Sequence, residues 1–520
     1  MDSTLTGSLG TTINTGNDTF VANMDTATFS VGDTISGGTG TDTLKIIKTA
    51  AIVAADVAPV GATLNSVEVL ELISGAGLTA VVTTGSGLAS ATQVTTTSLG
   101  ASALTAAATQ NVTMGVTGAV GAATAISVDG GLAVAVTATD TVATTATADG
   151  ITIGATTAAA GAVTVTNTVT STNTADGTTA TAGAIAVTGG TSVNVTQNIA
   201  ASSAAAATVL TANTTVTNTQ GQIDVTGTAA TKAVTVVQSA AVTAAPSTTA
   251  GVIGLINGAV NILDVNRTSA TAAGAITTAT VTNAGATVVN SGALTTLNLG
   301  GTLTTVNAGT LGALTTAANT ALAVNLTGAT IGTSLTIDTD ITTINISGSG
   351  TASTVASLVN ASATAVNVSG AAAVTITADT LAAAVVITST NTAGTTVTQQ
   401  MATGAQFVGG DGADSVSVAA TTKAINMGAG NDVVTISTET LGTGGTINGG
   451  TGTNTIVANT NTSALSGNAN ITNFTTLRVA GAAAQGAHNA TGFTALEVGL
   501  TGTNLAGAMS FTNVAAGTTL

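Results

Sequence analysis

The chain has 520 residues, of which only 5% are charged and 1% aromatic, and it contains no Cys, Trp or Tyr. Its net charge is −16 with only six Lys and Arg residues, which argues against nucleic acid as a partner because phosphate binding needs basic patches. The hydrophobic content of 44% and the many Val, Ile and Thr residues argue against disorder and favour strands.

Residues 1–72 are predicted to form a β segment with cation-binding turns. One stretch fits every fixed position of the nonapeptide G-G-x-G-x-D-x-U-x, where U is a large apolar residue, through Gly37, Gly38, Gly40 and Asp42. Asp33 lies nine residues earlier in the same register. Glycines let a short turn enter backbone conformations closed to other residues. The carbonyls of the turn and the Asp carboxylate can then face a hard cation, which prefers six to eight oxygen ligands.

Two further features belong to this first segment. Gly16, Asn17 and Asp18 form the second half of another copy of the motif. Glu68 lies in a predicted strand over residues 65–72, where a solvated strand face is favoured over a role as an additional ligand. Eight acidic residues fall within residues 1–72, so this part of the chain suits cations.

Residues 73–290 are predicted to be Thr/Ala/Val-rich strand repeats with few charges. Residues 184–197 and 222–238 each contain a strand of alternating apolar and polar residues, a glycine-containing turn and a second such strand. No fixed period links these units. They are interpreted as tandem β-sandwich-like modules or as an irregular solenoid.

Residues 291–520 show a clearer period and are predicted to form a β-solenoid. A cassette with an Asn between two apolar residues recurs at Asn298, Asn325, Asn345 and Asn367, with offsets of 27, 20 and 22 residues. Repeats of this length bury their apolar faces only by stacking on their neighbours. The core is expected to be thin, because no aromatic residue lies between Phe29 and Phe407.

The same nonapeptide returns within this solenoid, in a predicted calcium-motif segment over residues 409–457. A full copy consists of Gly409, Gly410, Asp411, Gly412 and Asp414. Eighteen residues later a second copy, with Met427 in place of the first glycine, contains Gly428, Gly430, Asn431 and Asp432. Because turns alternate sides, motifs 18 residues apart are expected to stack on one side. Asp414 and Asp432 are therefore predicted to flank one ion, and Glu439 adds to the acidic cluster.

The paired nonapeptides resemble the RTX repeat family. The order of the motifs in residues 1–72 resembles the opening of bacterial surface-layer (S-layer) and β-strand-repeat surface proteins. The resemblance implies an elongated parallel β-helix with RTX β-roll segments, and several Ca²⁺ ions bound between coils. It also implies type I secretion to the bacterial cell surface without a cleaved N-terminal signal, and calcium-dependent self-assembly into a lattice. Cell-surface polysaccharide is a candidate second partner.

Two alternatives to a lattice subunit remain. The first is a secreted RTX-type adhesin or extracellular matrix fibre, from which the sequence separates a lattice protein poorly. The second is an ice- or surface-binding solenoid with threonine ladders, indicated by T-x-T elements such as Thr168 to Thr170. This reading is less favoured, because those elements do not recur at a fixed spacing along the chain.

Enzymatic activity is not expected. The count of Cys and His excludes the usual zinc sites. The sole histidine, His488, is predicted to be an exposed loop residue. Asp338 and Asp340 are expected on one strand face, where a solvated face or a weak cation contact is favoured over an acid–base pair. No apolar run approaches the roughly 18 residues that span a bilayer, so membrane insertion is not expected.

Overall fold

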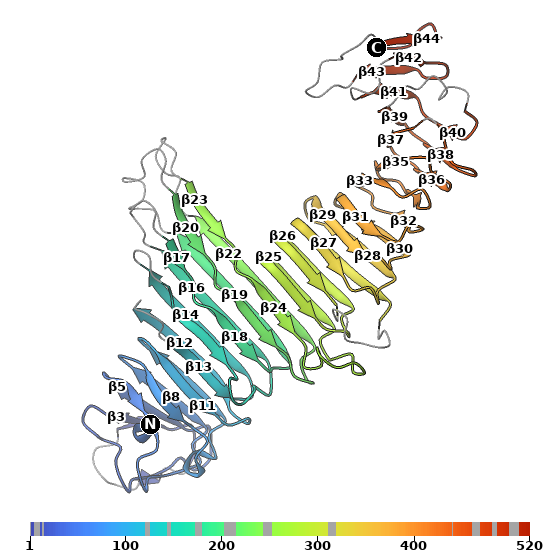
Figure 1. Cartoon of the computed structure of the whole chain (residues 1–520). Helices are drawn as coiled ribbons and strands as arrows, with labels where there is room; N and C mark the ends of the chain where they lie inside the picture. The colour runs from blue at the N-terminus through green and yellow to red at the C-terminus, as the bar shows by residue number, and fades with distance from the viewer. Residues whose placement is uncertain are drawn as a thin grey trace. The chain divides into compact units, whose positions relative to one another are not determined.

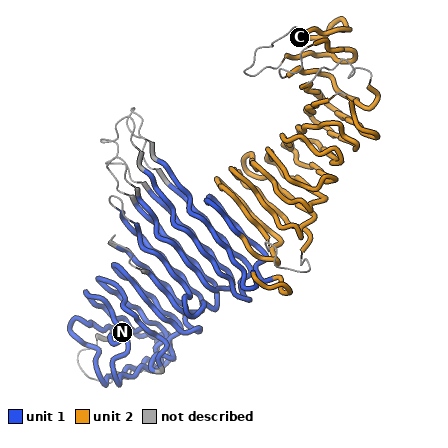
Figure 2. The backbone as a smooth tube through the Cα atoms, in the orientation of Figure 1, with its two compact units in different colours: residues 1–267, 274–288 blue, residues 268–273, 289–520 orange. Residues whose placement is uncertain are grey.

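Parallel strands stacked in successive coils build both units of the chain (Figure 1). The computed structural model describes residues 2–4, 11–12, 15–119, 125–142, 147–171, 179–201, 215–242, 252–309, 319–438, 440–459, 468–480, 486–498 and 509–520. Unit 1 contains Met1–Arg267 and Gly274–Val288, and unit 2 contains Thr268–Ala273 and Val289–Leu520 (Figure 2). The predicted all-β parallel solenoid is therefore confirmed.

Unit 1 has two long walls of parallel strands that alternate along the chain. The first wall runs through β1 (Asp2–Thr4), β3 (Thr19–Asn23), β5 (Thr43–Lys48), β8 (Val69–Ser74), β10 (Gln93–Ser98), β12 (Asn111–Ala119), β14 (Val134–Val142), β16 (Val163–Ser171), β19 (Ser192–Ala201), β22 (Ala233–Val242) and β25 (Thr278–Asn290). The second runs through β6 (Ile52–Val53), β9 (Leu78–Val82), β11 (Ser102–Ala106), β13 (Ala125–Gly130), β15 (Gly150–Ile153), β18 (Ile185–Thr188), β21 (Ile223–Thr226) and β24 (Val260–Leu263).

Short elements complete unit 1. Two small parallel sheets contain β2 (Thr11–Thr12), β4 (Thr34–Ser36) and β7 (Thr63–Asn65), and β17 (Thr179–Thr181), β20 (Thr215–Thr219) and β23 (Val252–Ile256). One helical turn, α1 (Ala54–Val57), and one 3₁₀ turn (Ser86–Leu88) lie between strands.

Unit 2 repeats the two-wall arrangement. One wall contains β26 (Thr296–Ala308), β27 (Ala321–Ile337), β29 (Ser353–Asn360), β31 (Val374–Leu381), β33 (Thr395–Met401), β35 (Ser415–Val418), β37 (Val433–Ile436), β39 (Thr455–Ala458), β41 (Thr476–Val479) and β43 (Ala495–Val498). The other contains β28 (Thr343–Ser349), β30 (Ala365–Gly370), β32 (Val386–Ser389), β34 (Gln406–Val408), β36 (Ala424–Asn426), β38 (Thr446–Asn448) and β40 (Ile471–Thr472). β42 (Gly486–Asn489) pairs with β44 (Met509–Thr512).

The core is built from columns of apolar side chains that stack from coil to coil. In unit 1 a column of valines joins Val112, Val134, Val163, Val193 and Val234, each paired with the next and each almost fully buried. Period-2 alternation sends valine inward and threonine outward on β14 and β16. Neighbouring coils therefore bury their apolar faces against each other.

Coil length differs between the units. The valines of the unit 1 column are 22, 29, 30 and 41 residues apart in sequence. In unit 2, Phe407, Ile425 and Ile447 are in register at spacings of 18 and 22 residues. The shorter and steadier coils explain why a period is visible in the sequence only beyond residue 290.

Residues 73–290 pair in parallel, whereas β-sandwich-like modules are built from antiparallel strands. The structure therefore favours the irregular solenoid over sandwich modules in this zone. The predicted boundary at residue 72 falls inside β8, which pairs with both β5 and β10.

Candidate functional site

The C-terminal motifs form corners between the two walls of unit 2. Residues 409–414 connect β34 to β35, residues 427–432 connect β36 to β37, and residues 449–454 connect β38 to β39. Since β35, β37 and β39 pair in register, the three corners lie on the same side of successive coils. Stacking therefore brings Asp414 and Asp432 together, as the 18-residue offset predicts.

Hydrogen bonds link these corners in what we call the C-terminal ladder: Thr395, Asp414, Asp432 and Asn454. The N–H of Thr395 donates to Oδ1 of Asp414 at 2.7 Å, and the N–H of Asp414 donates to Oδ1 of Asp432 at 2.8 Å. The N–H of Asp432 donates to Oδ1 of Asn454 at 3.0 Å. Each side chain thus accepts from the backbone of the preceding coil, which holds neighbouring coils in register.

In each aspartate of the C-terminal ladder, one carboxylate oxygen is buried without a hydrogen bond that would offset the loss of water. Asp414 and Asp432 are 1% and 0% exposed, and Oδ2 of each has no hydrogen-bond partner. Burial raises the pKa of Asp414, against the opposing effect of hydrogen bonds from the Thr395 backbone, the Ser389 side chain and the Gly410 backbone. Burial raises the pKa of Asp432 to about 6, and the negative charge of Asp414 adds to the rise. A proton or a cation at Oδ2 would remove this cost.

The glycines of the motif are required by close contacts between coils. A Cβ on Gly409 would overlap the carbonyl oxygen of Met427 and lie 2.7 Å from Oδ2 of Asp414. Gly430 has a φ of +133°, and its Cβ would lie 2.6 Å from the carbonyl oxygen of Gly412. The Met427 carbonyl oxygen and Oδ2 of Asp414 therefore both lie at the position that a side chain on residue 409 would occupy.

The N-terminal motif has the same design in unit 1. The N–H of Asp18 donates to Oδ1 of Asp42 at 2.8 Å, and the N–H of Asp42 donates to Oε2 of Glu68 at 2.9 Å. We call Asp18, Asp42 and Glu68 the N-terminal ladder. The first two are buried with Oδ2 unpartnered. A Cβ on Gly37 would overlap both the Ser66 carbonyl oxygen and Oδ2 of Asp42.

The remaining predicted residues take different places. Gly38, Gly40 and Gly428 adopt positive φ angles of 89°, 137° and 91°, and Gly410 lies beside the Ser389 carbonyl. Asp33 does not join the N-terminal ladder: its Oδ2 accepts from the N–H of Ser30 at 2.7 Å at the turn before β4. Asp33 lies only nine residues before Asp42, whereas residues one coil apart here are separated by 24 or 26 residues, so Asp33 lies at an earlier turn and not in the stack of Asp42.

Two predicted residues are exposed. Asn431 accepts from the N–H of Thr453 at 2.9 Å on the next coil, as Asn17 does from Thr41. Asp411 is exposed beside the C-terminal ladder. Glu439 lies outside the described residues.

Sequence reasoning singled out neither Thr395 nor Asn454 of the C-terminal ladder, and it disfavoured a ligand role for Glu68 of the N-terminal ladder. Asn454 was not singled out, although Gly449 to Asn454 reads G-G-x-G-x-N, the same motif with an amide for the carboxylate. Glu68 was expected on a solvated strand face, but it is half-buried and its carboxylate receives the Asp42 N–H. The available signal was its offset of 26 residues from Asp42, one coil length of this region.

The two ladders fit calcium in chemistry but offer few side-chain ligands. Among the described residues, no three His, Cys, Asp or Glu side chains gather as a metal centre. An ion at either ladder would therefore take a pair of carboxylates, Asp414 with Asp432 or Asp18 with Asp42. The Met427 and Ser66 carbonyls and water would complete the oxygen shell that Ca²⁺ prefers.

Two expectations about catalytic residues are wrong. His488 is fully buried within β42, with its ring centroid 5.8 Å from that of Phe511, because Gly486 opens a strand rather than a turn. Asp338 and Asp340 do not share a strand face. They lie in the turn after β27, where the N–H of Asp340 donates to Oδ1 of Asp338 at 3.0 Å.

A second candidate surface is the outer side of the first wall of unit 1. We call the outward side chains of β10, β12, β14, β16 and β19 the threonine face. Its threonines stack in register, as in the series Thr137, Thr166 and Thr196 and the pairs Thr117–Thr139 and Thr139–Thr168. These threonines stack in register although the T-x-T elements recur at no fixed sequence spacing, because unequal turns elsewhere absorb the difference.

The threonine face is uncharged. Its outward positions, in the described part of these strands, hold Thr, Asn, Ser, Gln, Ala and Gly. The second wall differs, since Asp129 and Asp224 point outward from β13 and β21. On a chain with a net charge of −16, such a neutral area is a distinctive feature.

No protein-family model and no curated protein matches the chain. Within the described residues, no helix has the length and apolarity needed to cross a bilayer. Functional inference therefore depends on the two ladders, the threonine face and the motif resemblance.

Proposed function

We propose that this chain is a calcium-dependent structural subunit of a bacterial surface layer, exported to the cell exterior, which assembles with copies of itself into a two-dimensional lattice. The observation that carries the proposal is the pair of buried carboxylate ladders, each with unpartnered oxygens at glycine corners. The resemblance of the same motifs to RTX and S-layer proteins supplies the cellular setting.

Calcium acts on folding in this proposal. Asp414 and Asp432 would hold one ion, and Asp18 and Asp42 another. A bound cation supplies positive charge that the chain itself does not provide there. Lys45 and Lys48, the basic residues closest in sequence to the N-terminal ladder, pair instead with Glu71 and Asp56. Extracellular modules bind calcium at about 10⁻⁴–10⁻³ M, so the fold would form outside the cell and not in a calcium-poor cytosol.

Assembly needs a surface that tolerates a second copy. Like-charged subunits repel, and the threonine face is a broad area where two copies can meet without opposed carboxylates. Its strands present regular rows of hydroxyl and methyl groups about 4.8 Å apart. We assign one of the lattice contacts to this face, with bound calcium lowering the repulsion at the others.

The calcium step is tested by thermal unfolding in metal-free buffer and in millimolar Ca²⁺. We expect a higher midpoint with Ca²⁺, since a ligand at ten times its Kd stabilises the native state by about 1.4 kcal/mol per site. Asp414→Asn and Asp432→Asn should each lose the same ion. The double variant should lose no further ion. Asp411→Asn, with the same charge change on an exposed neighbour, is the control. Equal midpoints with and without Ca²⁺ would refute the step.

The assembly step is tested by light scattering and electron microscopy across a Ca²⁺ titration, with Mg²⁺ for comparison. We expect ordered arrays for the natural chain and none for Thr166→Lys combined with Thr168→Lys. The control carries Thr152→Lys and Ala186→Lys on the second wall, which should still assemble. A chain that is folded by circular dichroism yet monomeric at millimolar Ca²⁺ would contradict the lattice. Isolated fibres instead of sheets would favour the alternative of an adhesin or matrix fibre.

A further inference from the structure

A pair of buried acidic side chains lies inside unit 1, on other coils than the N-terminal ladder. Asp140 points inward from β14, where it is in register with Gly118 of β12 and Val169 of β16. Asp149 directly precedes β15, and its backbone N–H donates to the Asp140 carboxylate. Both residues are 2% exposed. No motif in the sequence singles out either of them.

The two carboxylates face one small volume. The ideal Cβ position of Gly118 lies 2.8 Å from Oδ1 of Asp140 and 3.4 Å from Oδ2 of Asp149. Oδ2 of Asp140 is buried without a hydrogen-bond partner. The absence of a side chain at Gly118 is what lets both acids turn into the same interior space.

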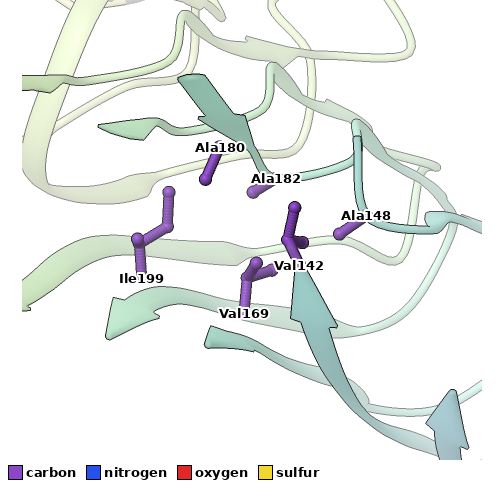
Figure 3. Close-up of a cluster of buried hydrophobic side chains, with 6 residues drawn as sticks. All are labelled: Val142, Ala148, Val169, Ala180, Ala182 and Ile199. Carbon is purple, nitrogen blue, oxygen red and sulfur yellow. The ribbon is translucent and has the colours of Figure 1, made fainter. Parts of the chain in front are cut away.

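No basic residue lies near the pair in the sequence. Val142, Ala148 and Val169 belong to a buried apolar cluster (Figure 3). Val142 and Ala148 are close to the pair in sequence, and Val169 is in register with Asp140. The sequence holds no Lys, Arg or His between residues 49 and 231, so no basic side chain from this stretch can neutralise them. Burial, followed by the charge of Asp149, raises the pKa of Asp140 to about 6. An ionised Asp140 would therefore place a negative charge, close to a second carboxylate, in a largely apolar interior, which is costly without a counter-charge.

We propose that Asp140 and Asp149 form a separate binding site for a divalent cation of the Ca²⁺ class, independent of the glycine-rich motifs. Hard cations take carboxylate oxygens as ligands, and the pair presents two acids to one volume. The ion is held inside the coil stack of unit 1 and joins β12, β14 and the start of β15. The competing possibility is that the two acids share a proton and bind no metal.

The test is the number of Ca²⁺ ions bound by the full chain, measured by equilibrium dialysis at pH 7.5. We expect Asp140→Asn to bind one ion fewer than the natural chain. Gly118→Ala, which keeps both acids but fills the volume between them, should lose the same ion. Thr117→Ala, on the outward side of the same strand, should leave the count unchanged.

A second measurement separates this site from the ladders. A variant with Asp42→Asn and Asp414→Asn should keep one ion, and adding Asp140→Asn should remove it. If that ladder variant binds no Ca²⁺, or if Asp140→Asn and Gly118→Ala both leave the count unchanged, the site does not exist. An unchanged count together with a higher metal-free melting midpoint in Asp140→Asn would identify the shared proton instead.

Discussion

At the residue scale, each Asp of a ladder has two oxygens with different tasks. One accepts the N–H of the preceding coil, as Asp432 does from Asp414 at 2.8 Å, and the other faces the corner without a partner. The first task is structural and holds without metal. The second makes the residue responsive to a proton or a cation. An Asn can perform only the first, as Asn454 does at the next corner.

The glycine positions allow a prediction at this scale. Gly412→Ala should destabilise unit 2 by about 1–3 kcal/mol, the usual cost of overpacking, because its Cβ would overlap the Asn391 carbonyl and lie 2.6 Å from the Gly394 nitrogen. Gly85→Ala is the control, since nothing lies within 4 Å of its Cβ position. Urea unfolding of both variants measures the difference. Equal midpoints would show that the corner is loosely packed.

At the scale of elements, the register of the coils depends on their turns more than on their strands. The Asn cassettes illustrate this: Asn298 pairs with Asn325 and Asn345 with Asn367, with amide-to-amide bonds of 2.8 Å in each pair. Asn325 does not continue the column, because it is in register with Ser347. The 20-residue offset between Asn325 and Asn345 is two residues shorter than the coil, so one cassette is displaced along the strand.

Buried amides also connect elements across the interior of unit 1. Gln197 of β19 is fully buried, accepts the N–H of Gly221 at 2.8 Å and donates to the carbonyl of Gly183 at 2.9 Å. Its side chain thereby bridges one wall to the corners that precede β18 and β21. Asn167 and Gln238 lie in register on either side of Gln197.

Gln197→Ala should therefore leave a buried N–H and a buried carbonyl unpaired. Each unsatisfied group costs about 1–3 kcal/mol, and amide hydrogen exchange at Gly221 should accelerate. Gln222→Ala, which removes an exposed amide bonded only to Asp224 among the described contacts, should change stability by less than about 0.5 kcal/mol. Unchanged exchange at Gly221 in Gln197→Ala would argue against the bridge.

At the scale of the whole molecule, the acidic residues set how stability depends on pH. The net charge is −16. The pKa values of the buried Asp140, Asp414 and Asp432 and of the half-buried Asp379 are all raised, with desolvation as the main cause. The folded form therefore holds protons more tightly than the unfolded chain does. The resulting stabilisation is complete below the ordinary value of 3.8 and is lost as the pH rises through about 6.

Metal-free protein should consequently melt at a higher temperature at pH 5 than at pH 7.5. In millimolar Ca²⁺ the difference should shrink, because the cation replaces the proton. Asp140→Asn combined with Asp432→Asn should flatten the metal-free profile. Thermal melts in metal-stripped buffers are the measurement, and a midpoint that falls from pH 7.5 to pH 5 would oppose the predicted sign.

The sequence by itself determined the parallel all-β solenoid, the thin aromatic-poor core and the stacking of Asp414 on Asp432. These features follow from the local alternation of apolar and polar residues and from the short, nearly constant sequence separation between equivalent residues of successive coils in unit 2. Only the tertiary structure decided the features that depend on coils of unequal length: the parallel walls of residues 73–290, the threonine face, the burial of His488 and the meeting of Asp140 with Asp149. In parallel stacking, contacts form between residues one coil apart. Where turns vary from coil to coil, that distance cannot be read from the sequence.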